Sequence, residues 1–243
     1  MNLTVSNKSN FLSYFLNPVS RLSNSCIANL DSESISTIIA AADNTSILYA
    51  KYKANLGESD IKLNLPDLSR LTKIIQCINK DDFQLNLAEN CLKYKDSRIQ
   101  FKYHLLENNI LTSPPISVDK IKALTFDTTF EVPYSNILDL IKTSTFAISL
   151  NKVYFYTKEG NVYAEVNDKQ SHNVDSVCIK LCDSYTGKDI PDGLPISFET
   201  LRTIIGARCE KVIVNINQQL NVMTFSINND ESNLKYIVSG LIK

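Results

Sequence analysis

Two segments of the chain, LSRLTKII at Leu68–Ile75 and FETLRTII at Phe198–Ile205, share one pattern of apolar residues. In each segment the first, fourth, seventh and eighth positions are apolar, which is the spacing of one face of an amphipathic helix. The two segments lie 130 residues apart in a chain of 243 residues. This repeat predicts two copies of the same helix, one in each half of the chain.

Two further matches follow the helical segments in the same order. FQLNL at Phe83–Leu87 matches VIVNI at Val212–Ile216, and FKY at Phe101–Tyr103 matches LKY at Leu234–Tyr236. Three matches in one order, with offsets that drift only by small insertions, predict a duplicated domain. Chance agreement between apolar patterns is the alternative interpretation.

The stretch ENNILTSPPIS, at residues 107–117, lies between the two copies. Its polar turn residues and its Pro-Pro pair favour an extended connector. Ile110, Leu111 and Ile116 are apolar residues in this otherwise polar stretch, so we expect the connector to lie over a hydrophobic surface. The predicted organisation is an N-terminal domain at 1–107, a connector at 108–120 and a C-terminal domain at 121–243.

Hydrophobic periodicity predicts an α+β fold in which strands dominate. Four helices are expected at Lys8–Leu22, Asp67–Asn79, Tyr134–Ser144 and Phe198–Cys209, and Pro18 should kink or interrupt the first. Strands are expected at Ser34–Ala42, Ser46–Ala54, Phe83–Leu87, Arg98–Leu106, Val153–Tyr156, Val162–Val166, Val174–Cys182, Val212–Asn217, Val222–Ile227 and Leu234–Leu241.

Composition disfavours several classes of enzyme. The chain has only 6 glycines and contains neither a GxGxxG nor a GxxxxGK[ST] motif, which disfavours a nucleotide-binding enzyme of either type. Its six cysteines are scattered and are interpreted as buried free thiols. We therefore expect no metal, no cofactor and no catalytic residue. The enzyme alternative, a cysteine beside His104 or His172 with Asp175 orienting the base, has no local motif in its favour.

The net charge of −1 conceals an uneven distribution of charge. The four predicted helices, with Lys80 counted at the end of the second, carry a net +5, so the rest of the chain carries −6. Arg70 and Lys73 project from one side of the second helix, away from its apolar stripe. Solvated helix faces are the ordinary explanation of such charges. If the helices share one side of the molecule, they form a positive wall while the sheets present an acidic exterior.

The duplicated domains, the basic helices in a mildly acidic chain and the connector with its Pro-Pro pair together resemble a DNA polymerase sliding clamp of the PCNA-like or tailed-phage type. NFLSYFLNPVSRLS at residues 10–23 looks like the first clamp helix, and LPDLSRLTKII at residues 65–75 looks like the second. LKYIVSGLI at residues 234–242 is similar to the last strand of PCNA. The resemblance covers nearly the whole chain and depends on architecture more than on any single motif.

The resemblance implies two clamp domains, each with two helices packed on curved antiparallel sheets, in a closed trimeric ring around duplex DNA. It implies DNA-facing roles for Lys8, Arg21, Arg70, Lys73, Lys80, Lys142, Arg202 and Arg208. It implies a pocket for client peptides formed by Leu30, Ile35, Ile110, Leu111, Ile237 and Ser239. It implies a subunit interface that contains Arg98, Ile99, Phe101, Tyr103, Val177, Ile179 and Leu181.

A clamp of this kind is not an enzyme: it binds double-stranded DNA without reading its sequence and tethers a DNA polymerase. Its expected partners are the polymerase, a clamp loader and further copies of itself as a homotrimer, with no membrane. The chain contains no secretory signal and no apolar run long enough for a membrane span, so we expect an intracellular protein. The resemblance implies a viral or phage protein in the host cytoplasm, or a nuclear protein if eukaryotic. A β-rich capsid, tail or scaffold protein that assembles without DNA is the alternative.

Overall fold

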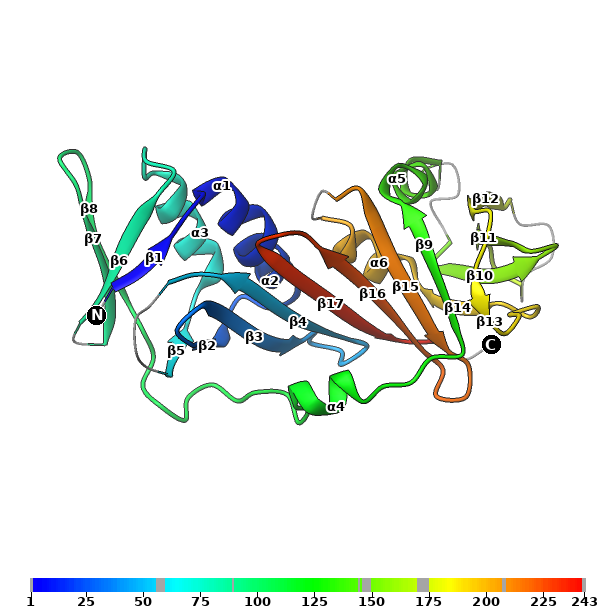
Figure 1. Ribbon diagram of the computed structural model, residues 1–243, viewed down its shortest axis with the longest axis horizontal. Helices are drawn as coiled ribbons and strands as arrows, with labels where there is room; N and C mark the ends of the chain where they lie inside the picture. The colour runs from blue at the N-terminus through cyan, green and yellow to red at the C-terminus, as the bar shows by residue number, and fades with distance from the viewer. Residues whose placement is uncertain are drawn as a thin grey trace. The chain divides into compact units, whose positions relative to one another are not determined.

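The chain folds into two compact units, which are described here from a computed structural model (Figure 1). The structure describes residues 2–55, 60–88, 90–143, 145, 150–169, 175–206 and 209–241. Unit 1 consists of Met1–Lys122 together with Asn229–Leu234, and unit 2 consists of Ala123–Asn228 together with Lys235–Lys243. A short segment from late in the sequence therefore belongs to the first unit.

Unit 1 contains two antiparallel sheets and three stretches of helix. Its elements are β1 (Asn2–Val5), α1 (Lys8–Phe11), a π-helical turn η1 (Leu12–Leu16), α2 (Asn17–Leu22), β2 (Cys26–Leu30), β3 (Ser34–Ala40), β4 (Ser46–Lys53), β5 (Ile61–Leu65), α3 (Leu68–Gln76), β6 (Phe83–Ala88), β7 (Cys91–Lys95), β8 (Gln100–His104) and α4 (Val118–Lys122).

Unit 2 follows the same sequence of helix and strand. Its elements are β9 (Thr128–Pro133), α5 (Tyr134–Thr143), β10 (Lys152–Lys158), β11 (Asn161–Val166), β12 (Val177–Cys182), β13 (Thr186–Gly187), β14 (Leu194–Ser197), α6 (Phe198–Ile204), β15 (Lys211–Asn217), β16 (Val222–Asn228) and β17 (Ser232–Ser239), the first residues of β17 belonging to unit 1.

The strand orders of the two units are equivalent. Unit 1 has the orders β1-β6-β7-β8 and β4-β3-β2-β5, and unit 2 has the orders β9-β15-β16-β17 and β12-β11-β10-β14. The three sequence matches fall on equivalent pairs, α3 with α6, β6 with β15, and β8 with β17. The predicted duplication is therefore confirmed by topology, and chance agreement of apolar patterns does not account for it.

The first predicted helix continues through Pro18 instead of breaking there. The backbone N–H of Asn17 donates to the carbonyl of Leu12, five residues earlier, so a π-helical turn precedes the proline. Proline has no N–H to continue an ordinary helical ladder, and a wider turn accommodates the missing hydrogen bond. The predicted interruption takes the form of a local widening within one helical run.

The matching helices α3 and α6 begin at equivalent caps. The Asp67 side chain accepts a hydrogen bond from the N–H of Arg70 at 2.8 Å, and the Ser197 hydroxyl accepts one from the N–H of Thr200 at 3.5 Å. Side-chain acceptors at this position satisfy N–H groups that have no partner within the helix. Helix α6 ends at Ile204, five residues before its predicted end, and Gly206 follows closely.

Each unit has an apolar core between its helices and sheets. In unit 1 the rings of Phe11, Phe15, Tyr52 and Phe83 form a continuous aromatic cluster. In unit 2 Phe155 packs edge-to-face on Phe225, with ring centroids 5.9 Å apart. Full burial of a large apolar side chain contributes about 1.5–3 kcal/mol relative to exposure, so these clusters hold the helices on the sheets.

The cysteines are free, and the expectation that they are all buried is wrong. Cys26 and Cys91 are buried, and burial raises the pKa of the Cys26 thiol to about 12. Cys77, which caps the end of α3, and Cys178 of β12 are exposed. The Cys77 thiol donates a hydrogen bond to the Lys73 carbonyl, and the Cys178 Sγ lies 3.2 Å from the Tyr156 hydroxyl. In the described part of the chain, no helix has the length and apolar character needed to cross a membrane.

Candidate functional site

The exposed sides of the unit 1 helices are basic. Arg70 and Lys73 project from α3, while Leu68, Leu71 and Ile75 on the opposite side are buried. In Figure 1, α2 and α3 lie together on the sheets of unit 1, and direct contacts join them. Two basic residues one helical turn apart on a helix give a local positive potential.

The end of α2 adjoins the start of α3. Asn24, just after α2, accepts hydrogen bonds from the N–H groups of Leu68 and Ser69 through its carbonyl and its side chain, at 2.7 and 3.0 Å. Arg21, in the last turn of α2, is exposed. This joint therefore brings a third base into the region of Arg70, whose guanidinium carbon lies 5.5 Å from the centre of the Tyr103 ring.

Lys8 and Lys80 are placed differently from the other predicted DNA-facing residues of unit 1. The Lys8 ammonium donates a hydrogen bond to the carbonyl of Ile78, shortly after the end of α3. Part of its hydrogen-bonding capacity is therefore used inside the unit. Lys80 is exposed and lies two residues further along the chain.

The unit 2 helices carry their bases next to acids. Lys142 on α5 lies 3.4 Å from the Asp139 carboxylate, and Arg202 on α6 lies 3.4 Å from the Glu199 carboxylate. Both pairs are solvent-exposed, so they contribute little to stability. Each carboxylate nevertheless offsets the charge that its helix presents. The predicted DNA-facing residue Arg208 lies outside the described residues.

A groove of about 460 Å³ lies between the connector and the outer side of the β2–β3 hairpin in unit 1. Ile27 of β2 and Ile38 of β3 form part of its wall, and the connector contributes residues 110–115. The side chain of Ile110 is 58% exposed. The groove thus combines apolar residues of both strands and of the connector with polar ones such as Ser23, Ser25 and Asn44.

The sequence-based prediction of this pocket was wrong for Leu30 and Ile35. Both side chains are only 2% exposed, because they point to the core face of the hairpin next to its turn. Ile237 is buried and Ser239 is exposed near the end of β17 in unit 2, and their place in a client pocket stays a prediction. Strand alternation was the signal that would have identified Ile27 and Ile38, which face opposite to Leu30 and Ile35.

Strands β8 and β12 are the last strands of their sheets among the described residues. Both predicted interface segments are therefore sheet edges, with backbone groups available for pairing. Ile99, Phe101, Val177 and Ile179 are half-buried beside these edges, and Arg98 is exposed in the turn before β8.

Two of the predicted interface side chains are already fully buried inside one chain. Tyr103 and Leu181 have 0% exposure, so in the predicted interface they would take part through their backbone and not through their side chains. The Tyr103 hydroxyl donates to the carbonyl of Asp67 at 2.9 Å and accepts from the N–H of the same residue at 2.9 Å. Tyr103 therefore anchors the start of α3 within unit 1.

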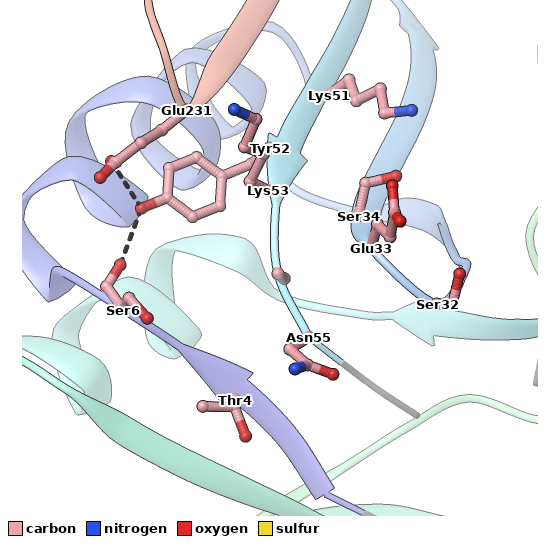
Figure 2. Close-up of a pocket in the computed structure, with 11 residues that line it drawn as sticks. Thr4, Ser6, Ser32, Glu33, Ser34, Lys51, Tyr52, Lys53, Asn55 and Glu231 are labelled. Carbon is pink, nitrogen blue, oxygen red and sulfur yellow. Dashed lines mark hydrogen bonds between the residues drawn. The ribbon is translucent and has the colours of Figure 1, made fainter. Parts of the chain in front are cut away.

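A second cavity in unit 1, of about 570 Å³, lies where residues 229–234 join that unit (Figure 2). The Tyr52 hydroxyl lies 2.9 Å from the Ser6 carbonyl oxygen and 3.0 Å from Glu231 Oε2. Asn10 Nδ2 donates to the same carboxylate oxygen at 2.8 Å. The cavity contains Lys51 and Lys53 as well as two glutamates, so its charge selects no single kind of ligand.

The comparisons with known proteins identify the fold. No protein-family model matches the sequence, and no curated protein matches it. Among solved structures, PCNA from A. fulgidus, bound to the C-terminal region of FEN-1, is 13% identical, with a TM-score of 0.80 over 100% of this chain and 99% of that one.

Two other solved structures give the same result. PCNA from Entamoeba histolytica is 9% identical, with a TM-score of 0.80 over 99% of this chain and 98% of that one. A chain of the PCNA2–PCNA3 complex from Sulfolobus tokodaii is 13% identical, with a TM-score of 0.74 and 99% coverage of both chains. The predicted fold is confirmed: this chain has the PCNA-like sliding-clamp fold over its whole length.

Proposed function

We propose that this chain is the subunit of a DNA sliding clamp, a processivity factor that encircles duplex DNA and tethers a polymerase. The observation that carries the proposal is the full-length PCNA-like fold, with its duplicated units. Fold alone does not assign function, so the proposal also depends on the surfaces that such a ring needs.

The basic helices supply the surface that would face DNA. Arg21 of α2 and Arg70 and Lys73 of α3 are exposed, and neither of these two helices contains an acidic residue. Lysine and arginine contacts to phosphates attract DNA without reading bases, which permits sliding. The contacts of Lys142 and Arg202 in unit 2 should be weaker, because Asp139 and Glu199 lie beside them.

The edges of the sheets supply the surface for a homotrimer. At the end of β4, the N–H of Lys53 donates to the carbonyl of Glu231, just before β17, at 2.7 Å. Strand β8 is the equivalent of β17, and β12 is the equivalent of β4. Pairing of β8 with β12 of another copy would repeat this internal arrangement, with Phe101 and Ile179 buried at the join.

The groove under the connector supplies the surface for clients. Ile27, Ile38 and Ile110 offer apolar contacts to a short peptide with apolar anchors. The polymerase and other clients would bind there, and a clamp loader would open the ring. The ring itself performs no chemistry in this proposal. It would act wherever the DNA is copied, in the cytoplasm or in a nucleus.

Topological retention on DNA tests the proposal without knowledge of the loader. A linear duplex is fixed to a bead at one end, the chain is allowed to thread over the free end, and that end is then blocked with streptavidin. A closed ring should stay on the blocked duplex in a high-salt wash that removes ordinary phosphate contacts.

Two controls complete this test. Duplex with an unblocked end should lose the protein in the same wash, and a restriction cut in the blocked duplex should release it. Equal retention on open and blocked duplex would contradict a sliding clamp. Absence of retention from a chain that still assembles would favour the scaffold alternative.

A further inference from the structure

The exposed face of sheet β1-β6-β7-β8 is basic and rich in carboxamides, contrary to the predicted acidic exterior. One row of paired residues crosses all four strands, from Asn2 through Asn86 and Lys93 to Lys102. The neighbouring row contains Gln84, Lys95 and Gln100, and it lies on the same face because side chains alternate along strands. Neither of these two rows contains an aspartate or a glutamate.

A hollow of about 380 Å³ lies on this face. Its lining contains no carboxylate and comprises Asn2, Gln84, Asn86, Lys93, Tyr94, Lys95, Gln100, Phe101 and Lys102. The nearby acid Asp96, in the β7–β8 turn, accepts hydrogen bonds from the N–H groups of Arg98 and Ile99 at 2.7 and 2.8 Å. Its carboxylate is therefore engaged by the turn.

Two of the lysines stand directly opposite each other. Lys93 and Lys102 are paired across β7 and β8. Lys95 and Lys102 are both exposed, and the negative charge of a bound anion would attract both side chains. Lys95 lies two residues along β7 on the same face, about 7 Å away by strand geometry. A flexible polyanion would reach all three lysines at once.

We propose that this face, the lysine face of Asn2, Gln84, Asn86, Lys93, Lys95, Gln100 and Lys102, binds the backbone of single-stranded DNA. Lysines bind phosphates, and the carboxamides of asparagine and glutamine hydrogen-bond both to phosphates and to base edges. Binding would be independent of sequence and sensitive to salt. The lysine face belongs to a sheet, apart from the basic helices assigned to duplex DNA.

The proposed ring adds a reason to favour nucleic acid over an acidic peptide, and this step rests on the proposed function. If β8 pairs with β12 of another copy, the lysine face continues onto the outer side of β12, where Lys180 is exposed and forms an ion pair with Asp183. Next to Lys180, Tyr156 and Tyr163 are stacked with ring centroids 5.5 Å apart. Aromatic rings beside lysines are the usual platform for single-stranded bases.

Binding of a fluorescent oligothymidine of about 20 nucleotides tests the proposal in the whole protein. The variant Lys95→Gln/Lys102→Gln should bind at least tenfold more weakly at low salt. The slope of log affinity against log salt should fall by about 1.4, since each lysine–phosphate contact on a single strand contributes about 0.7. The matched control Lys51→Gln/Lys53→Gln removes two exposed lysines from β4 and should leave both values unchanged.

The possible outcomes distinguish a failure of the lysine-face proposal from a failure of the proposed clamp function. Parent-like oligothymidine binding by the Lys95/Lys102 variant would overturn the lysine face, whatever happens to retention on blocked duplex. Stronger competition by a poly-glutamate peptide than by unlabelled oligothymidine would overturn it in favour of an acidic protein partner. If the lysine variant loses oligothymidine binding while the parent fails to stay on blocked duplex, the lysine face stands and the clamp function falls. Tyr163→Ala should weaken binding in the assembled protein only.

Discussion

The two units share one topology and differ in the charges on their helices. In unit 1, Arg70 and Lys73 project from α3 with no acid on that helix. In unit 2, the equivalent helix α6 pairs Arg202 with Glu199. Duplication has therefore kept the packing pattern of the helix but not its surface charge. Buried positions are constrained by the volume of the core, whereas exposed positions are free to diverge.

The largest expected effect concerns the two sheet edges, one from each unit. Phe101→Glu on β8 or Ile179→Glu on β12 should convert trimers to monomers, because a carboxylate would be buried without a partner at the join. Sedimentation velocity measures the change. Lys102→Glu, on the opposite face of β8, is the matched control and should leave the trimer intact. A trimeric Phe101→Glu variant would move the subunit interface elsewhere.

The second effect compares the basic helices of the two units. Reversal of Arg21, Arg70 and Lys73 to glutamate should weaken binding to duplex DNA by more than tenfold and reduce the salt slope by about 3, at about 0.9 per phosphate contact. Fluorescence anisotropy across a salt series gives both values. The unit 2 reversal Lys142→Glu/Arg202→Glu should have a smaller effect, because Asp139 and Glu199 already offset those charges. An equal loss of DNA affinity per reversed residue in the two units would show that these ion pairs do not weaken the contribution of Lys142 and Arg202.

The third effect concerns the connector groove of unit 1 as the site that binds client peptides. Ile110→Ser/Leu111→Ser should weaken binding of the cognate polymerase's C-terminal peptide about tenfold, since each lost apolar contact contributes about 1 kcal/mol or less. Isothermal titration calorimetry measures the affinity. Leu220→Ser in unit 2 is the matched control, because Leu220 is 58% exposed, as Ile110 is. Identical peptide affinities for the double variant and the parent would place the client site elsewhere.

The smallest effect concerns the anchor of α3 in unit 1. Tyr103→Phe should lower the free energy of unfolding by about 1 kcal/mol, because the N–H of Asp67 loses its hydrogen-bond acceptor. Burial raises the pKa of Tyr103 to about 12, above its usual value near 10. The parent should therefore lose the contribution of this tyrosine to the free energy of unfolding as the pH rises from about 10 to about 12.

Denaturant melts of the parent and of Tyr103→Phe from pH 8 to pH 12 check both statements. The difference in stability between the two proteins should be constant up to about pH 10 and should narrow above it. A difference that widens with pH would mean that the hydroxyl is not held in its neutral form by the fold.

The sequence by itself determined the four longest helical runs and the duplication, but not the short helix α4. The apolar spacing of Leu68–Ile75 and Phe198–Ile205, with Asp67 and Ser197 before them, is local information that fixes which side of a helix is buried. It also identified the exposed bases of α3 and the apolar residue Ile110 of the connector. Short strands such as β1 and β7 were missed, because four or five residues carry too little periodicity.

Only the tertiary structure decided which strands end a sheet and which side of a strand meets another surface. Strand pairing joins residues far apart in the chain, so no local pattern shows that β8 and β12 lie at edges or that Glu231 docks on Tyr52 of unit 1. Leu30 and Ile35 were assigned to the client pocket through the resemblance to sliding clamps, and only the packed structure shows that the connector lies over the side of the hairpin that carries Ile27 and Ile38.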